Sequence, residues 1–206
     1  MATGTISKNV GSYDTTDYAW HASSNMSNGY NGPDNTTYAQ ISLTRNENAV
    51  TYVYWIFDSL SSIPADATID SVSCTCKCSI SNTASARVAT RQAQLYSGTT
   101  AMGSAYTVAN STDTFSIPAG TWTRAQLQNA RLRLYAVRGT SSTTTNYFFR
   151  FYGASITVNY TYQGVSYQIR VKQNGTWVSA TKVMVKQNGS WVEATSVKAK
   201  DNGTWH

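Results

Sequence analysis

The stretch NYFFRFYGASITVNYTY (146–162) carries the clearest sign of the fold. Apolar and polar residues alternate along it, which is the pattern of a β-strand with one buried face. Phe149 and Phe151 share one parity, the apolar positions from Ile156 onward share the other, and Gly153 lies where the phase changes. A glycine at such a point favours a β-bulge. We therefore predict one long strand that is bulged at Gly153.

Four earlier segments repeat the same period of two. They are VTYVYWIF (50–57), TIDSVSCTCKCSI (68–80), RVATRQAQLY (87–96) and RLRLYAV (131–137). Each is predicted to be a strand with one buried face. Only residues 123–129 look helical, with Thr123 as the N-cap and Gln126 in the reciprocal capping position. The pattern thus predicts one short helix in an otherwise β domain.

Composition agrees with an all-β protein. The 206 residues include 25 Ser, 29 Thr and 15 Asn, together with 14 Tyr, 6 Trp and 5 Phe, so turn formers and large apolar rings are both plentiful. Two long connections, at residues 25–38 and 97–114, favour a jelly-roll-type β-sandwich over a small closed barrel. We assign this sandwich to residues 1–162.

The remaining residues, 163–206, contain a repeat of 14 residues. Its units are IRVKQNGTWVSATK (169–182), VMVKQNGSWVEATS (183–196) and the shorter VKAKDNGTWH (197–206). Fourteen residues suit one β-hairpin, and the Asn-Gly pair in each unit is typical of a tight primed turn. A lone hairpin is marginal in water, so each unit is expected to pack against its neighbour or against copies in other subunits.

Each hairpin unit carries one tryptophan two residues after its glycine. These residues are Trp177, Trp191 and Trp205. They are either the packing residues between hairpins and subunits or a row of sugar-stacking platforms, because an indole ring serves both purposes. Spacing alone does not separate these two interpretations.

The segment FDSLSSIPADATIDSVSCTCKC (57–78) resembles the F-D-x-S-x-I-P-x-x-A-T-I-x-S stretch of carbohydrate-binding-module-like jelly-roll domains. Such domains recur in bacterial surface proteins and in structural proteins of tailed bacteriophages. RFYGASITVNYTY (150–162) resembles their last strand, and the V-K-x-N-G-x-W tail units resemble hairpin repeats at the ends of phage tail-tip and fibre proteins. The resemblance implies a virion structural protein that contacts other virion proteins. Because stacked hairpins gain their burial from neighbours, we expect the repeats to join subunits of a homo-oligomer, with a trimer favoured.

The segment YAWHASSNMSNGYNGPDNTTY (18–38) is the best binding candidate in the body. It sets Tyr18, Trp20, Tyr30 and Tyr38 among Asn, Ser, Gly and Asp residues. Rigid rings beside adaptable hydrogen-bonding groups can hold a sugar, such as a host-surface polysaccharide, and can equally pack onto a neighbouring subunit or the sandwich edge.

Asp58, Asp66 and Asp70 form a cluster in sequence around Pro64. Aspartates in such positions ordinarily bond the backbone of a turn. Calcium binding, a frequent feature of similar jelly rolls, is the alternative for some of them. No other cofactor is expected.

Cys74, Cys76 and Cys78 occupy alternate positions of one predicted strand. Their side chains diverge too much to converge on one metal ion, and neighbours at this spacing do not readily form a disulfide. We interpret them as small buried apolar residues, which suits synthesis in a reducing cytoplasm.

The sequence offers little for catalysis. The two histidines are His21, in a polar segment, and His206, the last residue, and no phosphate loop, zinc-ligand spacing or nucleophile elbow occurs. Of the net charge of +6, +4 belongs to residues 163–206, where the lysines are scattered singly among polar and apolar residues and not clustered, which argues against nucleic acid as a partner. No run of 18 apolar residues and no signal peptide within residues 1–17 is seen, so neither a membrane partner nor secretion is expected.

These observations predict a non-enzymatic bacteriophage virion structural protein exposed on the particle surface as a fibre, tail-tip or capsid-decorating component. It would be synthesised in the host cytoplasm, and adhesion to host-surface glycans is compatible with this role. The alternative is a carbohydrate-binding module of a bacterial surface or secreted system. Motifs of this kind name an architecture better than a function.

Overall fold

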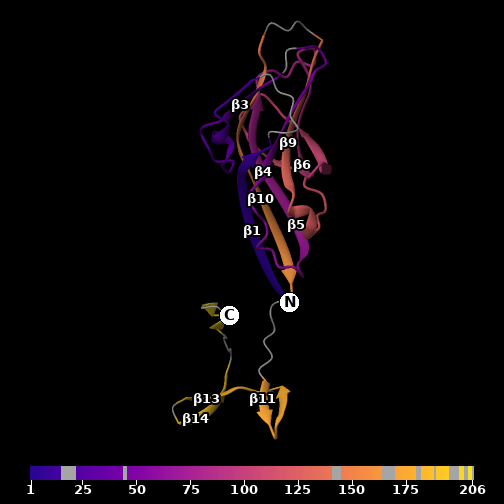
Figure 1. The fold of residues 1–206 in the computed structure, drawn as a ribbon. Coiled ribbons are helices and arrows are strands. Elements are labelled where there is room, and N and C mark those ends of the chain that lie inside the picture. Colours follow the sequence, from indigo (N-terminus) through magenta and orange to yellow (C-terminus); the bar gives the residue numbers. More distant parts are fainter. Residues whose placement is uncertain are drawn as a thin grey trace. The chain divides into compact units, whose positions relative to one another are not determined.

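The computed structural model describes residues 1–14, 22–43, 46–140, 145–163, 170–179, 182–187, 189–194, 200–201 and 204–205. Contacts within the chain divide it into two compact units, Met1–Tyr162 and Gln163–His206. The first unit is built of antiparallel strands, and the second of short hairpins (Figure 1).

The described strands of the first unit are β1 (Ala2–Tyr13), β2 (Ala22–Ser24), β3 (Ala39–Ser42), β4 (Val50–Phe57), β5 (Thr68–Ile80), β6 (Val88–Ser97), β7 (Thr100–Thr107), β8 (Thr114–Ile117), β9 (Ala130–Arg138) and β10 (Phe148–Tyr162). The short helical elements are η1 (Met26–Gly29), a 3-10 helix, and α1 (Arg124–Leu127). The predicted long strands at 50–57, 68–80, 87–96, 131–137 and 146–162 are therefore confirmed to within a few residues.

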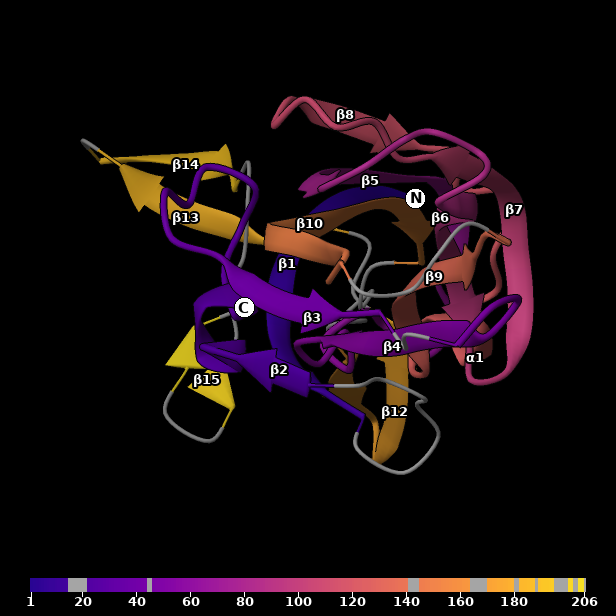
Figure 2. The same cartoon turned by 90° about the horizontal axis from the view of Figure 1, so that it is seen from above.

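Two sheets face each other across the core. One has the order β1-β10-β5-β8, with β3 and then β2 added along the first half of β10, and the other has the order β4-β9-β6-β7. From β4 to β10 the chain alternates between the sheets, except that β6 and β7 are neighbours in one of them. This connectivity is the jelly roll, and the two layers are seen from above in Figure 2. The end of β1 also pairs with β4, after a register shift between Val10 and Ser12, and so joins the sheets.

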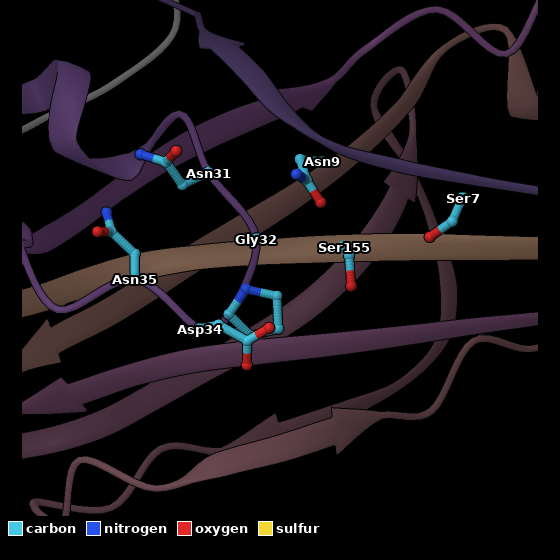
Figure 3. Close-up of a pocket in the computed structure, with 8 residues that line it drawn as sticks. Ser7, Asn9, Asn31, Gly32, Asp34, Asn35 and Ser155 are labelled. Atoms are coloured by element: carbon cyan, nitrogen blue, oxygen red, sulfur yellow. The ribbon is translucent and has the colours of Figure 1, made fainter.

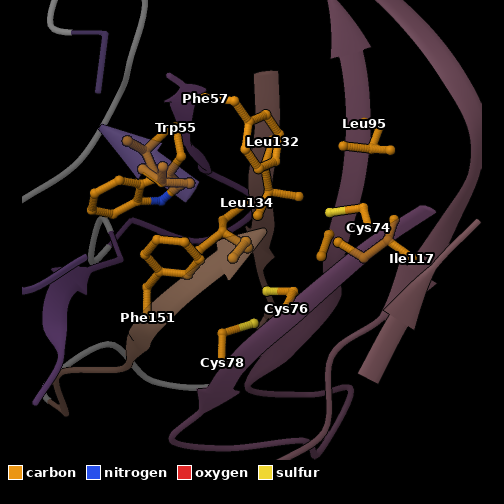
Figure 4. Close-up of a cluster of buried hydrophobic side chains, with 14 of the residues drawn as sticks. Trp55, Phe57, Cys74, Cys76, Cys78, Leu95, Ile117, Leu132, Leu134 and Phe151 are labelled. Atoms are coloured by element: carbon orange, nitrogen blue, oxygen red, sulfur yellow. The ribbon is translucent and has the colours of Figure 1, made fainter. Parts of the chain in front are cut away.

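Alternating side chains from both sheets fill the space between them. Residues of β9 are buried at every second position, and the rings of Trp55 and Phe151, from opposite sheets, stack with centroids 4.3 Å apart. Figure 4 shows Cys74, Cys76 and Cys78 directed into the same core. All three thiols are buried and unoxidised, as predicted for small apolar packing residues.

Two local predictions are confirmed in detail. The register of β10 against β5 shifts between Phe151 and Gly153, and Gly153 has a φ of 142°, which side chains rarely tolerate. At α1 the Thr123 hydroxyl accepts a hydrogen bond from the Gln126 amide, and the Gln126 side chain accepts one from the Thr123 amide. This is a complete capping box.

One expectation about the connections is wrong. Residues 97–114 do not form a long loop, because β7 occupies Thr100–Thr107 and pairs with β6. The sequence TAMGSAYT alternates weakly and places Met102 as its one buried apolar side chain, so its strand signal is faint. Residues 25–38 do form a connection without a strand, and η1 is its only helical element.

The described residues of the second unit form three hairpins, one in each repeat, as predicted. They pair β11 (Arg170–Gln173) with β12 (Thr176–Ser179), β13 (Met184–Gln187) with β14 (Ser190–Glu193), and β15 (Lys200–Asp201) with β16 (Thr204–Trp205). In the first turn Asn174 and Gly175 have φ values of 50° and 82°, and in the second Gly189 has a φ of 83°. Positive φ at both central residues is what a primed turn requires.

Candidate functional site

Rows of hydroxyl and amide side chains cover the outer face of the sheet that contains β1, β10 and β5. The register places Thr3, Thr161 and Thr68 in one row, Thr5, Asn159 and Ser71 in the next, Ser7, Thr157 and Ser73 in a third, and Asn9, Ser155, Thr75 and Ser116 in a fourth. Within the second row Thr5 Oγ1 donates to Asn159 Oδ1 (2.7 Å), and Asn159 Nδ2 donates to Ser71 Oγ (2.9 Å). We call these thirteen residues the hydroxyl face.

A loop lies against this face because of the bulge in β10. The Ala154 amide donates a hydrogen bond to the Asn31 carbonyl oxygen (3.1 Å). A Cβ atom on Gly153 would collide with the carbonyl oxygens of Asn31 and Gly32. Glycine therefore allows residues 31–35 to approach the backbone of β10 closely.

Residues 31–35 and the hydroxyl face together line a polar pocket of about 410 Å³ that is open to solvent (Figure 3). Its walls are Ser7, Asn9 and Ser155 from the strands and Asn31, Gly32, Pro33, Asp34 and Asn35 from the loop. The side chains of Asn9, Asp34 and Ser155 form no hydrogen bond with any other residue of the described part of the chain. Amide, carboxylate and hydroxyl groups in this arrangement can bind the hydroxyls of a small polar ligand.

Beyond this pocket, cationic and aromatic side chains continue along the same outer face. Tyr38 and Tyr152 lie with ring centroids 5.3 Å apart, and the Lys77 ammonium stands 5.1 Å from the Tyr152 ring. Lys77 also donates to the Asn35 carbonyl oxygen (3.1 Å), which ties β5 to the loop. Arg150 lies over the other side of this group, 5.2 Å from the Tyr38 ring. These contacts are within the range of cation–π attraction.

Arg150 also lines a second pocket, of about 350 Å³. The other walls are Ser79, Ile80, Ser81, Asn110 and Phe148. Two pockets thus lie on one outer face, with Tyr38 and Tyr152 as part of the same surface.

The aromatic residues predicted for binding have separate locations. Tyr38 reaches the outer surface described above, whereas Tyr30 packs inward, with its ring centroid 6.0 Å from that of Tyr13 and 6.3 Å from that of Trp55. Burial, followed by the neighbouring Tyr13, raises the pKa of Tyr30. Tyr18 and Trp20 lie outside the described residues.

Among the tail tryptophans, Trp191 on β14 is 66% exposed. Trp177 lies on β12 opposite Lys172, and Trp205 lies on β16 opposite Lys200. The side chains of Trp177 and Trp205 lie outside the described part of the structure.

The three aspartates considered for calcium have exposed side chains. Asp70 accepts a hydrogen bond from Thr161 Oγ1 (2.7 Å), and Asp58 lies beside Gly11. Asp66 occupies the turn after Pro64, whose carbonyl accepts from Ala67. Within the described residues no group of three or more His, Cys, Asp or Glu side chains could hold a metal ion. The structure therefore does not gather these aspartates into a calcium site.

The buried thiols are poor nucleophiles. Burial raises the pKa of Cys74 far above its usual range, and burial together with neighbouring Cys78 does the same for Cys76. Because the thiolate is the reactive form, these residues are inert at neutral pH.

The outer face of the other sheet carries a second group of arginine and tyrosine residues. Arg131 forms an ion pair with Asp14 (2.8 Å). The Arg133 guanidinium lies 4.3 Å from the Tyr96 ring and 4.7 Å from the Tyr135 ring. Like Arg150, Arg133 thus lies over two aromatic rings.

The hydroxyl face was missed by sequence reasoning, although a signal for it exists. Three runs of the sequence place a Ser, Thr or Asn at every second position: T-x-T-x-S-x-N (3–9), S-x-S-x-T (71–75) and S-x-T-x-N-x-T (155–161). Each run predicts a strand with a polar face, but only their alignment in one sheet turns three runs into a surface.

Comparison of the chain with family models, with curated proteins and with solved structures finds no match. No helix in the described residues is long and apolar enough to cross a membrane.

Proposed function

We propose that this chain is a non-enzymatic structural protein of a tailed-bacteriophage virion, displayed on the particle surface. The jelly-roll body is the exposed module. The hairpin tail joins copies of the chain, in a trimer by preference, and contacts other virion proteins.

The observation that carries this proposal is the exposure of apolar side chains in the tail. Six large apolar side chains are exposed among the described residues, and four of them belong to the hairpin of β13 and β14: Met184, Val185, Trp191 and Val192. In the described part of the body, in contrast, only Met1 and Val50 are exposed large apolar side chains. Apolar surface concentrated on one element marks an association site.

The register of this hairpin supports association with a partner. Val185 pairs with Val192 on one face, while Lys186 pairs with Trp191 on the other, so both faces carry apolar side chains. A two-stranded hairpin of this length is marginal alone. Packing against repeats in other copies would cover both faces, and identical repeats make identical, mutually complementary surfaces.

The resemblance of residues 57–78 and of the tail units to phage proteins supports the virion assignment. Three free buried thiols suit assembly in a reducing cytoplasm, whereas a β-sandwich rich in Ser, Thr and Asn is typical of extracellular proteins. A virion protein fits both, because it is made inside the cell and then released.

The test is the protein content of phage particles. Tailed particles are purified by density gradient from lysates of cells that encode the chain, and their proteins are identified by mass spectrometry. We expect the chain in stoichiometric amounts with the other particle proteins. Its recovery only in a secreted or cell-surface fraction would favour the alternative, a carbohydrate-binding module of a bacterial system.

A second candidate function, glycan binding by the body, is favoured by the hydroxyl face and its pocket. Uncharged hydroxyl and amide groups match the hydroxyl groups of a sugar, and Tyr38 supplies a ring beside them. Binding of the full chain to an array of bacterial surface glycans tests it. Saturable binding supports adhesion, and an absence of binding by folded protein leaves the structural role alone.

A further inference from the structure

We propose that the pocket at Arg150 binds the carboxylate group of an acidic polysaccharide. This inference rests on the second candidate function, glycan binding by the body, and specifies its ligand class. Sugars next to the acidic one would lie along the hydroxyl face.

The strands hold Arg150 at a fixed place on this face. Arg150 pairs with Gln40 of β3 and with Ser79 of β5, so it has a neighbouring strand on either side. Its guanidinium carbon lies 5.2 Å from the Tyr38 ring centroid and 5.1 Å from that of Phe148. Two rings thus limit the movement of the guanidinium before any ligand binds, which lowers the entropic cost of binding.

No described residue accepts a hydrogen bond from the Arg150 side chain. Its Nε atom is buried and forms no hydrogen bond, and the ion pairs among the described residues involve other cations, Arg131 and Lys182. Arg150 lines the pocket, so its charge faces the space that a ligand would fill. A carboxylate offers two oxygens in the geometry that a guanidinium fork matches, and so pairs this charge at the terminal nitrogens.

The rest of the pocket suits a sugar rather than a bare anion. Ser79, Ser81 and Asn110 line it together with the Phe148 ring, and its volume of about 350 Å³ is at the lower end of small-ligand sites. Ser81 Oγ already accepts a hydrogen bond from the Phe148 amide (3.0 Å), which leaves its hydrogen to donate to a ligand oxygen.

The neighbouring surface explains why the ligand would be a polymer. Lys77 and Tyr152 lie on the same outer face, and the first pocket offers Asn9, Asp34 and Ser155 beyond them. The Asp34 carboxylate would repel a second acidic group but accepts hydrogen bonds from neutral hydroxyls. A polysaccharide that contains both acidic and neutral sugars therefore matches this surface better than a polysaccharide in which every sugar is charged.

The experiment measures binding of the full chain by titration calorimetry. The probes are hyaluronate, in which acidic and neutral sugars alternate, polygalacturonate, which is acidic throughout, and the carboxyl-reduced form of each. The variant is Arg150→Gln, and the matched control is Arg133→Gln, because Arg133 lies over two tyrosine rings on the other sheet and also has a buried Nε without an acceptor. Arg150→Lys keeps the charge and removes the fork, and near-ultraviolet circular dichroism checks that each variant is folded.

We expect hyaluronate to bind more tightly than polygalacturonate. Carboxyl reduction of hyaluronate and the Arg150→Gln substitution should each lower the binding affinity at least tenfold. Arg150→Lys should lower the affinity less, and Arg133→Gln should leave it unchanged. Equal binding of native and reduced polymers, unchanged in Arg150→Gln, would overturn the carboxylate inference and leave glycan binding standing. Failure of the folded protein to bind any of the four polymers would also overturn it. The virion proposal is independent of these outcomes, because it is tested on particles.

Discussion

Replacing Trp191 with alanine is expected to weaken self-association of the chain. The indole is 66% exposed on the hairpin of β13 and β14. A fully exposed tryptophan presents about 250 Å², so roughly 165 Å² of this ring is open to a partner. At about 25 cal/mol per Å², complete burial contributes about 4 kcal/mol for each copy.

Packing between copies is not complete, and alanine keeps one carbon atom of the side chain. We therefore expect Trp191→Ala to cost about 2–4 kcal/mol per interface, a rise of about 30- to 1,000-fold in the dissociation constant. Sedimentation equilibrium over a range of protein concentrations measures this directly. The control is Val50→Ala, which removes an exposed apolar side chain from the body and should leave association unchanged.

Two results would refute the reasoning. A wild-type chain that is monomeric at all concentrations shows that the exposed hairpin has no self-partner. An oligomer that Trp191→Ala leaves as stable as the wild type shows that the tail tryptophan does not carry the contact.

Three further substitutions test the body of the protein. Gly153→Ala should lower the free energy of unfolding by about 1–3 kcal/mol and weaken glycan binding, because the new Cβ displaces the loop from β10. The control is Gly98→Ala, because Gly98 has a φ of 57° and open space around it. It should lower the free energy of unfolding and leave glycan binding unchanged. Thr123→Ala should cost about 1 kcal/mol through loss of the capping box, whereas exposed Thr121→Ala should cost little, both read from urea unfolding. Because burial raises the pKa of Cys74 in the folded state, its stabilising contribution is complete below the unfolded value, near 9.0, and is lost as pH rises above it. We therefore expect the free energy of unfolding, measured with urea, to fall with pH between pH 9 and pH 11 more steeply in the wild type than in Cys74→Ala. The two slopes should differ by about 1.4 kcal/mol per pH unit. Equal slopes would contradict the claim that burial raises the pKa of this thiol.

The long strands and their sandwich could be predicted because each carries its own pattern. Residues 68–80 and 146–162 alternate over enough positions to define a buried face, and Gly153 marks the change of phase. The capping box at Thr123 and the Asn-Gly turns are equally local, since their residues lie within a few positions of one another. Signals of this kind survive in the fold because tertiary contacts reinforce them.

The candidate site could be predicted only in part, because it depends on pairing between distant strands. Asn9 and Ser155 become neighbours through the register of β1 and β10, and the loop at Asn31 reaches them only because of the bulge. In the sequence Arg150 is simply one arginine beside aromatic residues of a strand, and its position near the Tyr38 and Phe148 rings depends on the fold. Tyr30 and Tyr38 are equally aromatic in sequence, yet one packs against the core and the other faces outward.

Immunogold electron microscopy of intact particles tests the central claim most directly. Antibodies raised against the jelly-roll body are applied to unfixed tailed particles that encode the chain. The proposal predicts gold at one fixed location, on the tail or on the capsid, of undamaged particles. Labelling that occurs only after the particles are broken open, or never, would contradict display on the virion surface.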